Sequence, residues 1–265
     1  AAAGARALVA SGAARTDQEA RWALAVVRSR AFPVGRDPAL CPLLDLLNHH
    51  APQPGAAQAA ACRYTRLEPD AVGMVAQREV SSGEELCHHY ALCPSADLLA
   101  GYGFVPDAGN AGFEACLLEV PAEEFSAGSG EAAALREEAF RRRGLWRGSR
   151  FGRPLLIPLS GSPGLDGGLL LPAARLAALG RAEEVRELGD EVLEQQRPLG
   201  DPAQERAALA LALRWLGGQR AGADAAAVET PQEAGPAGEA LRRLLRVESS
   251  LLAGRAERLR AAAPA

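Results

Sequence analysis

The four histidines of the chain fall in two adjacent pairs, at residues 49–50 and 88–89. Asn48 stands directly before the first pair, after the apolar run PLLDLL, and Tyr90 stands directly after the second pair. Burying an amide or an imidazole without a hydrogen-bond partner is costly. The run PLLDLL predicts a buried segment, and a ligand could satisfy the polar groups at its end. The alternative is a helix or strand terminus that Asn48 caps, with the histidines at the surface.

The same region carries residue types that bind zinc, namely the four histidines with Cys41, Cys62, Cys87 and Cys93. Structural zinc sites usually show close pairs such as C-x2-4-C, and this sequence has none. Neighbouring histidines on a strand point to opposite faces, so each pair offers at most one ligand. We therefore predict no metal and keep a zinc-binding Cys/His protein as an alternative.

Short elements are predicted around these residues. An amphipathic helix is expected over 17–31, with acids in its first turn, arginines in its last and Phe32-Pro33 at its end. Short strands are expected over 62–67, 72–77 and 85–90, joined by turns at 68–70 and 81–83. One or two helical turns are expected over 95–101.

The second half of the sequence has a different pattern. A segment rich in glycine and small polar residues, 107–112, predicts a domain boundary. One strand is expected over 115–120, and amphipathic helices are expected over 131–143, 168–180, 181–195, 202–219 and 237–261. Linkers rich in Gly, Pro, Ala and Ser are expected over 146–166 and 220–236. The predicted fold class is α+β, with short strands first and helices after them.

The composition excludes several classes of protein. Of the 265 residues, 48% are hydrophobic and 23% charged, which predicts a packed core rather than disorder. A net charge of −4 argues against a nucleic-acid binder. Five irregularly spaced cysteines favour a reduced compartment, and no apolar run reaches the ~20 residues of a membrane helix. No G-x-S-x-G elbow, Walker loop or Rossmann glycine loop is present.

Four motifs stand in a fixed order over residues 21–105: WALAVVRSRAF, PLLDLLNHH, SSGEELCHHY and ADLLAGYGFV. This order resembles the SET domain of the Rubisco large-subunit methyltransferase family. Members show a helix ending in SRAF, a D-x-x-N-H segment, a G-E-E/Q strand that ends in Tyr, and a Y-G-F close. The family includes protein lysine methyltransferases and an actin histidine methyltransferase. The resemblance therefore implies an S-adenosylmethionine-dependent protein-lysine N-methyltransferase.

The resemblance implies roles for the residues around the methyl donor. Asn48 and His49 match the pair that holds S-adenosylmethionine, through the asparagine amide and the histidine backbone. Arg30 matches the SRAF arginine beside cofactor and substrate, and Tyr90 also borders the cofactor. Asp45 matches the aspartate of D-x-x-N-H and is expected to orient that segment.

Two tyrosines match the catalytic pair of the family. Tyr90 matches the catalytic tyrosine, and Tyr102 matches the second tyrosine of the lysine channel. The segment of Tyr90 and the Asn-His segment would cross in a pseudoknot. Methyl transfer by in-line displacement needs alignment at near-attack distance, without a metal or a covalent intermediate. A narrow, dry channel also favours the neutral amine, because desolvation lowers the pKa of a lysine.

The resemblance implies two domains: the C-terminal half of a SET domain over 1–106 and a helical substrate-binding domain over 112–265. Two departures stand out. Pro94-Ser95-Ala96-Asp97 replaces the family's Ser-Asn-Ala-Glu, and the N-terminal SET strands with their Gly-x-Gly turn have no match beyond Ala3-Gly4-Ala5. About half of the methyl-donor site is therefore expected in this chain. A non-catalytic SET-like protein-binding module is the alternative.

The expected partner is a protein substrate, either the Rubisco large subunit or another chloroplast or cytosolic protein. We expect no nucleic acid, no membrane and a monomer. Plant members of the family favour the chloroplast over the cytoplasm. Lysine and histidine both stay open as the target residue.

Overall fold

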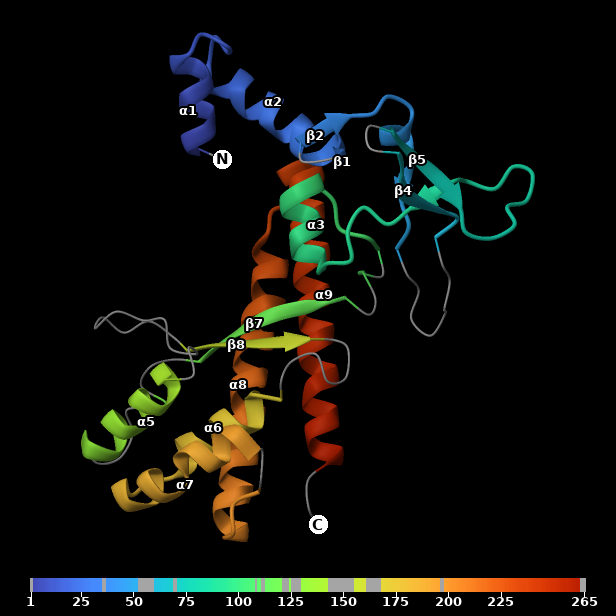
Figure 1. Cartoon of the computed structure of the whole chain (residues 1–265). Coiled ribbons are helices and arrows are strands. Elements are labelled where there is room, and N and C mark those ends of the chain that lie inside the picture. The colour runs from blue at the N-terminus through green and yellow to red at the C-terminus, as the bar shows by residue number, and fades with distance from the viewer. Residues whose placement is uncertain are drawn as a thin grey trace. The chain divides into compact units, whose positions relative to one another are not determined.

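The computed structural model describes residues 2–34, 37–51, 60–68, 71–107, 109–110, 113–120, 124, 130–142, 155–160, 168–195 and 198–262. The chain forms two compact units, Ala1–Gly112 and Phe113–Ala265 (Figure 1). No helix in the described ranges has both the length and the apolar character needed to cross a membrane.

Helices open the first unit. Helix α1 (Ala2–Ala10) packs on α2 (Asp17–Arg30) around a small core of Ala5, Ala14 and Ala20. Thr16 caps α2, because its hydroxyl accepts a hydrogen bond from the backbone N–H of Glu19. The helix predicted over 17–31 is thus confirmed to within one residue. The later helices of this unit are the 3-10 turn η1 (Leu44–Leu46) and α3 (Ser95–Tyr102).

Three two-stranded sheets follow in the same unit. Strands β1 (Ala31–Val34) and β2 (Asp37–Leu40) are antiparallel, as are β4 (Cys62–Glu68) and β5 (Ala71–Ala76). Strands β3 (Asn48–His49) and β6 (Cys87–His88) pair in parallel. The strands predicted over 62–67 and 72–77 are confirmed, whereas the strand predicted over 85–90 is only two residues long. Residues 69 and 70 of the first predicted turn lie outside the described residues.

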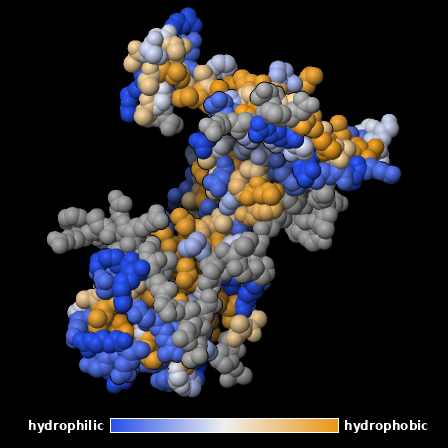
Figure 2. Space-filling model, viewed as in Figure 1, coloured by the Kyte–Doolittle hydropathy of each residue, from blue (hydrophilic) through white to orange (hydrophobic). Residues whose placement is uncertain are grey.

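The run PLLDLL is not the buried segment that its composition predicts. Leu43 is 74% exposed and Leu46 is 66% exposed. Within this run Leu44–Leu46 forms the 3-10 turn η1, and Leu43, directly before it, takes a positive φ of 74°. An element of three residues is too short to hold the whole run against one core. Apolar residues reach the surface of the first unit on the face shown in Figure 2.

The second unit combines a two-stranded antiparallel sheet with helices. Strands β7 (Ala115–Val120) and β8 (Leu155–Ser160) are antiparallel, with Leu118 opposite Ile157. The helices are α5 (Gly130–Arg142), α6 (Leu170–Ala178), α7 (Ala182–Gln195), α8 (Pro202–Glu229), η2 (Gln232–Ala234) and α9 (Gly235–Ala261). Their core includes Leu118, Phe140, Ile157, Leu176, Leu216 and Leu252.

Both linkers predicted in this unit are partly wrong. Residues 155–160 of the first form β8, because the apolar LLIPLS pairs with β7 and fills the core. The rest of that predicted linker, residues 146–154 and 161–166, lies outside the described residues. The second is helical up to Glu229, because its alanines favour helix and α8 packs along α9, where Arg220 donates a hydrogen bond to Ser249 at 3.3 Å.

A buried ion pair joins two helices of the second unit. Arg175 of α6 and Glu205 of α8 are 2.6 Å apart, with side chains 6% and 11% exposed. The Glu205 carboxylate also accepts from the backbone N–H of Leu199 at 2.9 Å. The carboxylate is thereby held in its charged form, and the pair fixes the start of α8 against α6.

Candidate functional site

The parallel pairing of β3 with β6 brings the two histidine segments together. Asn48 lies opposite Cys87 and His49 opposite His88, and the backbone N–H of His50 donates to His88 at 2.8 Å. Tyr90 follows β6 directly, so the pairing carries it to the Asn-His segment. The two segments expected to cross do lie side by side.

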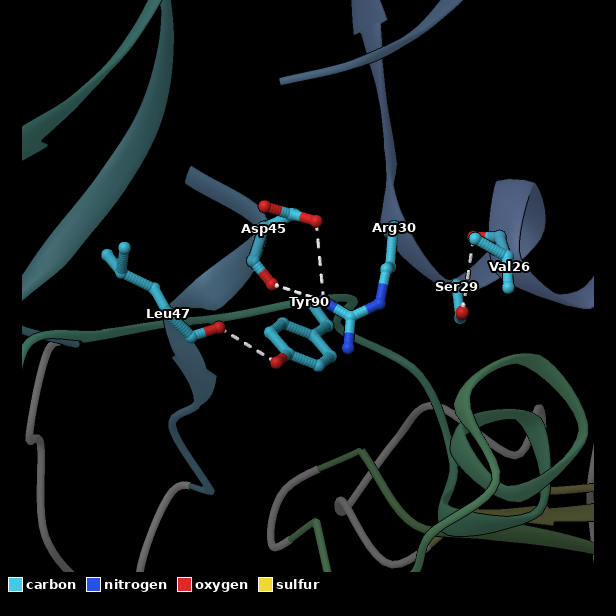
Figure 3. A network of polar contacts seen from close by, with 6 residues as sticks. All are labelled: Val26, Ser29, Arg30, Asp45, Leu47 and Tyr90. Atoms are coloured by element: carbon cyan, nitrogen blue, oxygen red, sulfur yellow. Dashed lines mark hydrogen bonds and ion pairs between the residues drawn. The ribbon is translucent and has the colours of Figure 1, made fainter. Parts of the chain in front are cut away.

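Arg30 ties the end of α2 to the 3-10 turn η1 (Figure 3). Its Nη1 donates to the backbone oxygen of Asp45 at 3.1 Å and to the Asp45 carboxylate at 3.3 Å. Double contact to the main chain and side chain of one residue fixes the direction of the guanidinium. Asp45 therefore links Arg30 to the turn that leads into Asn48, and its role in orienting that segment stays a prediction.

Asn48 has a partner that sequence reasoning missed. Its Nδ2 donates to the Glu85 carboxylate at 2.6 Å, a charge-assisted hydrogen bond that orients the amide. Glu85 is the second glutamate of the G-E-E motif that precedes β6. The motif itself was the available signal, but its pairing with Asn48 depends on the β3–β6 register.

The two tyrosine rings lie against each other at a tilt of 39°, and both hydroxyls donate hydrogen bonds to the backbone. The Tyr90 hydroxyl donates to Leu47 O at 2.8 Å (Figure 3), and the Tyr102 hydroxyl donates to Tyr90 O at 3.3 Å. Their ring centroids are 4.9 Å apart. Burial raises the pKa of both phenols above the usual range, although the Arg30 cation acts in the opposite direction on Tyr90. Both hydroxyls therefore stay protonated at neutral pH.

The imidazole of His49 bonds to the backbone of Tyr90. Its Nδ1 accepts from the Tyr90 N–H at 3.1 Å, and the rings of these residues lie 5.4 Å apart. Burial is the main cause that lowers the pKa of His49 to about 4. The ring is thus neutral near pH 7, and because Nδ1 accepts from the Tyr90 N–H, the single ring proton lies on Nε2.

Two cavities meet at this cluster. The larger has a volume of about 410 Å³ and the smaller about 240 Å³. Both are lined by Ser29, Arg30, Asp45, Tyr90 and Tyr102. The larger cavity adds Leu46, Asn48, His49 and Phe104, and the smaller adds Ala31, Phe32, Pro33, Leu47, Tyr64, His88 and His89. The tyrosine pair therefore borders two compartments of different chemical character.

The smaller cavity has an aromatic wall. Phe32 stacks on Tyr64 with centroids 5.3 Å apart, and Phe32 lies 5.9 Å from His88. Tyr64 donates its hydroxyl to the backbone oxygen of Pro33. Sequence reasoning did not select Phe32 or Tyr64 as site residues; Phe32 is the last residue of the SRAF motif, whereas Tyr64 arrives from the distant β4 and carries no local signal.

All six residues predicted from the sequence come together. Arg30, Asp45, Asn48, His49, Tyr90 and Tyr102 line the larger cavity. Their roles in binding and catalysis stay predictions. Among the described residues, no group of three or more His, Cys, Asp or Glu side chains is arranged to hold a metal ion.

Comparison with solved structures identifies the architecture. The SET domain of LSMT bound to lysine and AdoHcy matches with a TM-score of 0.55 and 20% identity, over 93% of this chain and 56% of that chain. Rubisco LSMT bound to sinefungin and monomethyllysine matches with a TM-score of 0.56 and 19% identity, over 93% of this chain and 55% of that chain. This chain has the fold of those proteins. The predicted α+β class and the predicted SET-type resemblance are confirmed at that level.

The chain spans 55–56% of the length of these solved structures. Neither a protein-family model nor a curated protein sequence matches it. The fold is therefore known from three-dimensional similarity, and the chemistry has to be argued from the site.

Proposed function

We propose that this protein takes part in S-adenosylmethionine-dependent methyl transfer to the ε-amine of a lysine in a protein substrate. The observation that carries this proposal is the position of Tyr90 and Tyr102, which line both cavities. A methyl donor on one side of the tyrosine pair and an amine on the other would meet at the phenols. Solved structures with this fold are bound to lysine with AdoHcy, and to monomethyllysine with sinefungin.

The larger cavity fits the cofactor. Its volume of about 410 Å³ lies within the range of about 300–1,000 Å³ typical of small-molecule sites. Asn48 offers an oriented amide, and Phe104 and Tyr90 offer ring faces that attract a cation. When bound, S-adenosylmethionine supplies a methyl group on a positively charged sulfonium. We assign Asn48, His49 and Arg30 to holding it, with Asp45 orienting Arg30.

The smaller cavity suits the amine. Its walls of Phe32, Tyr64 and Tyr90 are apolar on their faces, so they exclude water from the aliphatic part of a lysine side chain. Exclusion of water lowers the pKa of the lysine and so favours the neutral nucleophile. The Tyr90 ring is fixed by its hydrogen bond to Leu47 O and restricts the amine to one approach. This placement supports the roles predicted for Tyr90 and Tyr102.

The amine-binding cavity favours a class of substrate, a protein that presents a lysine side chain. We propose a protein substrate and a monomeric enzyme, located in the chloroplast or the cytoplasm. The Rubisco large subunit is one candidate.

Calorimetry with S-adenosylmethionine tests the cofactor half of the proposal. We expect binding at one site per chain, weakened in Asn48→Ala and retained in Tyr90→Phe. Transfer of a labelled methyl group to lysine in acceptor proteins tests the reaction. Failure of the cofactor to bind would favour the alternative, a non-catalytic SET-like interaction module.

A further inference from the structure

Glu85 lies just before the crossing of β3 and β6, and it contacts a residue assigned to the cofactor. It stands two residues before Cys87, which is opposite Asn48 in the parallel register. Its carboxylate accepts a hydrogen bond from Nδ2 of Asn48 at 2.6 Å. Among the described residues, Asn48 lines the larger cavity, and Glu85 lines neither cavity. Glu85 would therefore reach a ligand in the larger cavity through Asn48.

The carboxylate decides which end of the Asn48 amide faces it. An ionised carboxylate accepts hydrogen bonds and donates none, whereas an amide donates from its nitrogen and accepts at its oxygen. The end that contacts Glu85 is therefore the nitrogen, because the opposite assignment would place two acceptors 2.6 Å apart. A hydrogen bond to a charged acceptor is also about twice as strong as a neutral one. The oxygen of Asn48 is then the acceptor that the amide keeps for a ligand.

The neighbouring glutamate of the same G-E-E motif has a different role. The carboxylate of Glu84 accepts from the backbone N–H of Ser81 at 3.1 Å and forms an ion pair with Arg78. The backbone N–H of Glu84 donates to Ser81 O at 3.1 Å, which closes the turn before β6. Glu84 thus holds the turn, whereas Glu85 holds Asn48. The two glutamates carry the same charge at adjacent positions, so Glu84 provides a matched control.

We propose that Glu85 is a positioning residue that holds the Asn48 amide by its nitrogen, so that the amide oxygen is kept for a hydrogen-bond donor of the ligand in the larger cavity. That this ligand is S-adenosylmethionine rests on the proposed function. The α-ammonium of S-adenosylmethionine and the exocyclic amine of its adenine are donors of this class, and its carboxylate is not. Glu85 thereby favours an amine of the cofactor over its carboxylate at Asn48.

A carboxylate near the cavity could also act by charge alone, because the sulfonium of S-adenosylmethionine is positive. The two mechanisms make different predictions. Attraction by charge weakens when either glutamate is neutralised, and it is smaller for S-adenosylhomocysteine, whose sulfur carries no charge. Orientation needs an acceptor oxygen at residue 85 and none at residue 84. It acts equally on both ligands, because they carry the same amines.

Calorimetry on the full chain with both ligands is the test. Glu85→Ala should weaken both affinities by the same factor, about threefold to tenfold, the range of one hydrogen bond. Glu85→Gln keeps an acceptor oxygen and should lose less, and Glu84→Gln should change neither affinity. In an Asn48→Ala background, Glu85→Ala should have no further effect, since the group it orients is gone. A further loss in that background would overturn the proposal, as would a larger loss for S-adenosylmethionine than for S-adenosylhomocysteine.

Exchange of the two partners gives a second variant with the net charge of the wild type. In Asn48→Asp alone, two carboxylates face each other and repel. Addition of Glu85→Gln supplies an amide that donates to the new aspartate, which keeps an oxygen for the ligand. Orientation predicts that the double variant binds S-adenosylmethionine more tightly than Asn48→Asp alone. The reverse order would contradict the proposal, because the single variant carries one more negative charge and gains only by attraction.

The contact between Asn48 and Glu85 can also be tested without a cofactor. Nitrogen-15 NMR of the Asn48 side-chain amide, assigned by its loss in Asn48→Ala, should show one proton shifted downfield by the carboxylate. Glu85→Ala should remove that shift, and Glu84→Gln should keep it. An amide signal that Glu85→Ala leaves unchanged would refute the positioning role even if the cofactor binds. Because this spectrum needs no ligand, it fails separately from the proposed function.

Discussion

Removal of one oxygen atom at Tyr90 should separate alignment from binding. In Tyr90→Phe the bond from the phenol to Leu47 O, 2.8 Å long, is lost. The ring keeps its neighbours, with centroids at 4.9 Å for Tyr102, 5.0 Å for His88 and 5.4 Å for His49. A single neutral hydrogen bond contributes about 1 ± 0.5 kcal/mol to stability. The folded state should therefore survive, with a loss of about 1 kcal/mol in the free energy of unfolding.

The expected effect on turnover is larger. Small errors in alignment at a reacting centre lower rates on the order of 10²-fold. We expect Tyr90→Phe to reduce the initial rate of labelled methyl transfer on that scale, while calorimetry shows nearly unchanged affinity for S-adenosylmethionine. Tyr64→Phe is the matched control for stability, because its hydroxyl also donates to a backbone oxygen, that of Pro33. Normal turnover in Tyr90→Phe would refute the role assigned to the phenol.

Three further perturbations address the cofactor site, the buried histidine and the second unit. Asn48→Ala should weaken S-adenosylmethionine binding in calorimetry by about tenfold, which corresponds to the free energy of one hydrogen bond. Unchanged affinity would contradict the assignment of Asn48 to the cofactor site. Because burial lowers the pKa of His49 from 6.5 to about 4, the unfolded chain binds that proton first, and the free energy of unfolding should fall as pH drops through this interval. His49→Gln should lose that part of the dependence in urea titrations at several pH values, and an unchanged slope would contradict the assignment. Glu205→Ala should cost about 3–5 kcal/mol by denaturant unfolding, because it leaves the buried Arg175 cation without this carboxylate. Arg175→Met with Glu205→Leu should recover most of that loss, and a cost for Glu205→Ala below 1 kcal/mol would contradict a stabilising pair.

The residues that touch one cavity could be predicted from the order of the motifs. SRAF, D-x-x-N-H and the strand that ends in Tyr90 each supply one part of the larger cavity. Local sequence signals also predicted α2, β4 and β5. The charged residues at the ends of a helix and the apolar pattern of a strand each depend only on residues within that element.

What could not be predicted depends on pairing over long sequence distances. The bond between Asn48 and Glu85 exists only in the β3–β6 register, and Tyr64 reaches Phe32 only once β4 is folded. The exposed Leu43 shows a second limit, because the composition of an apolar run does not reveal that a positive φ and a short 3-10 turn interrupt it. Asn110 is fully buried, and it donates hydrogen bonds to Cys93 O and the Ser95 hydroxyl, which lie 15 or more residues earlier in the chain.

The location of the transferred methyl group tests the account most directly. S-adenosylmethionine labelled with carbon-13 on its methyl group can be titrated into the full chain, and nuclear Overhauser contacts from that methyl can be observed. Contacts to the ring protons of Tyr90 and Tyr102 are predicted, since both rings line the cavity assigned to the cofactor. A bound methyl group that contacts neither ring would contradict the claim that the tyrosine pair separates donor from acceptor.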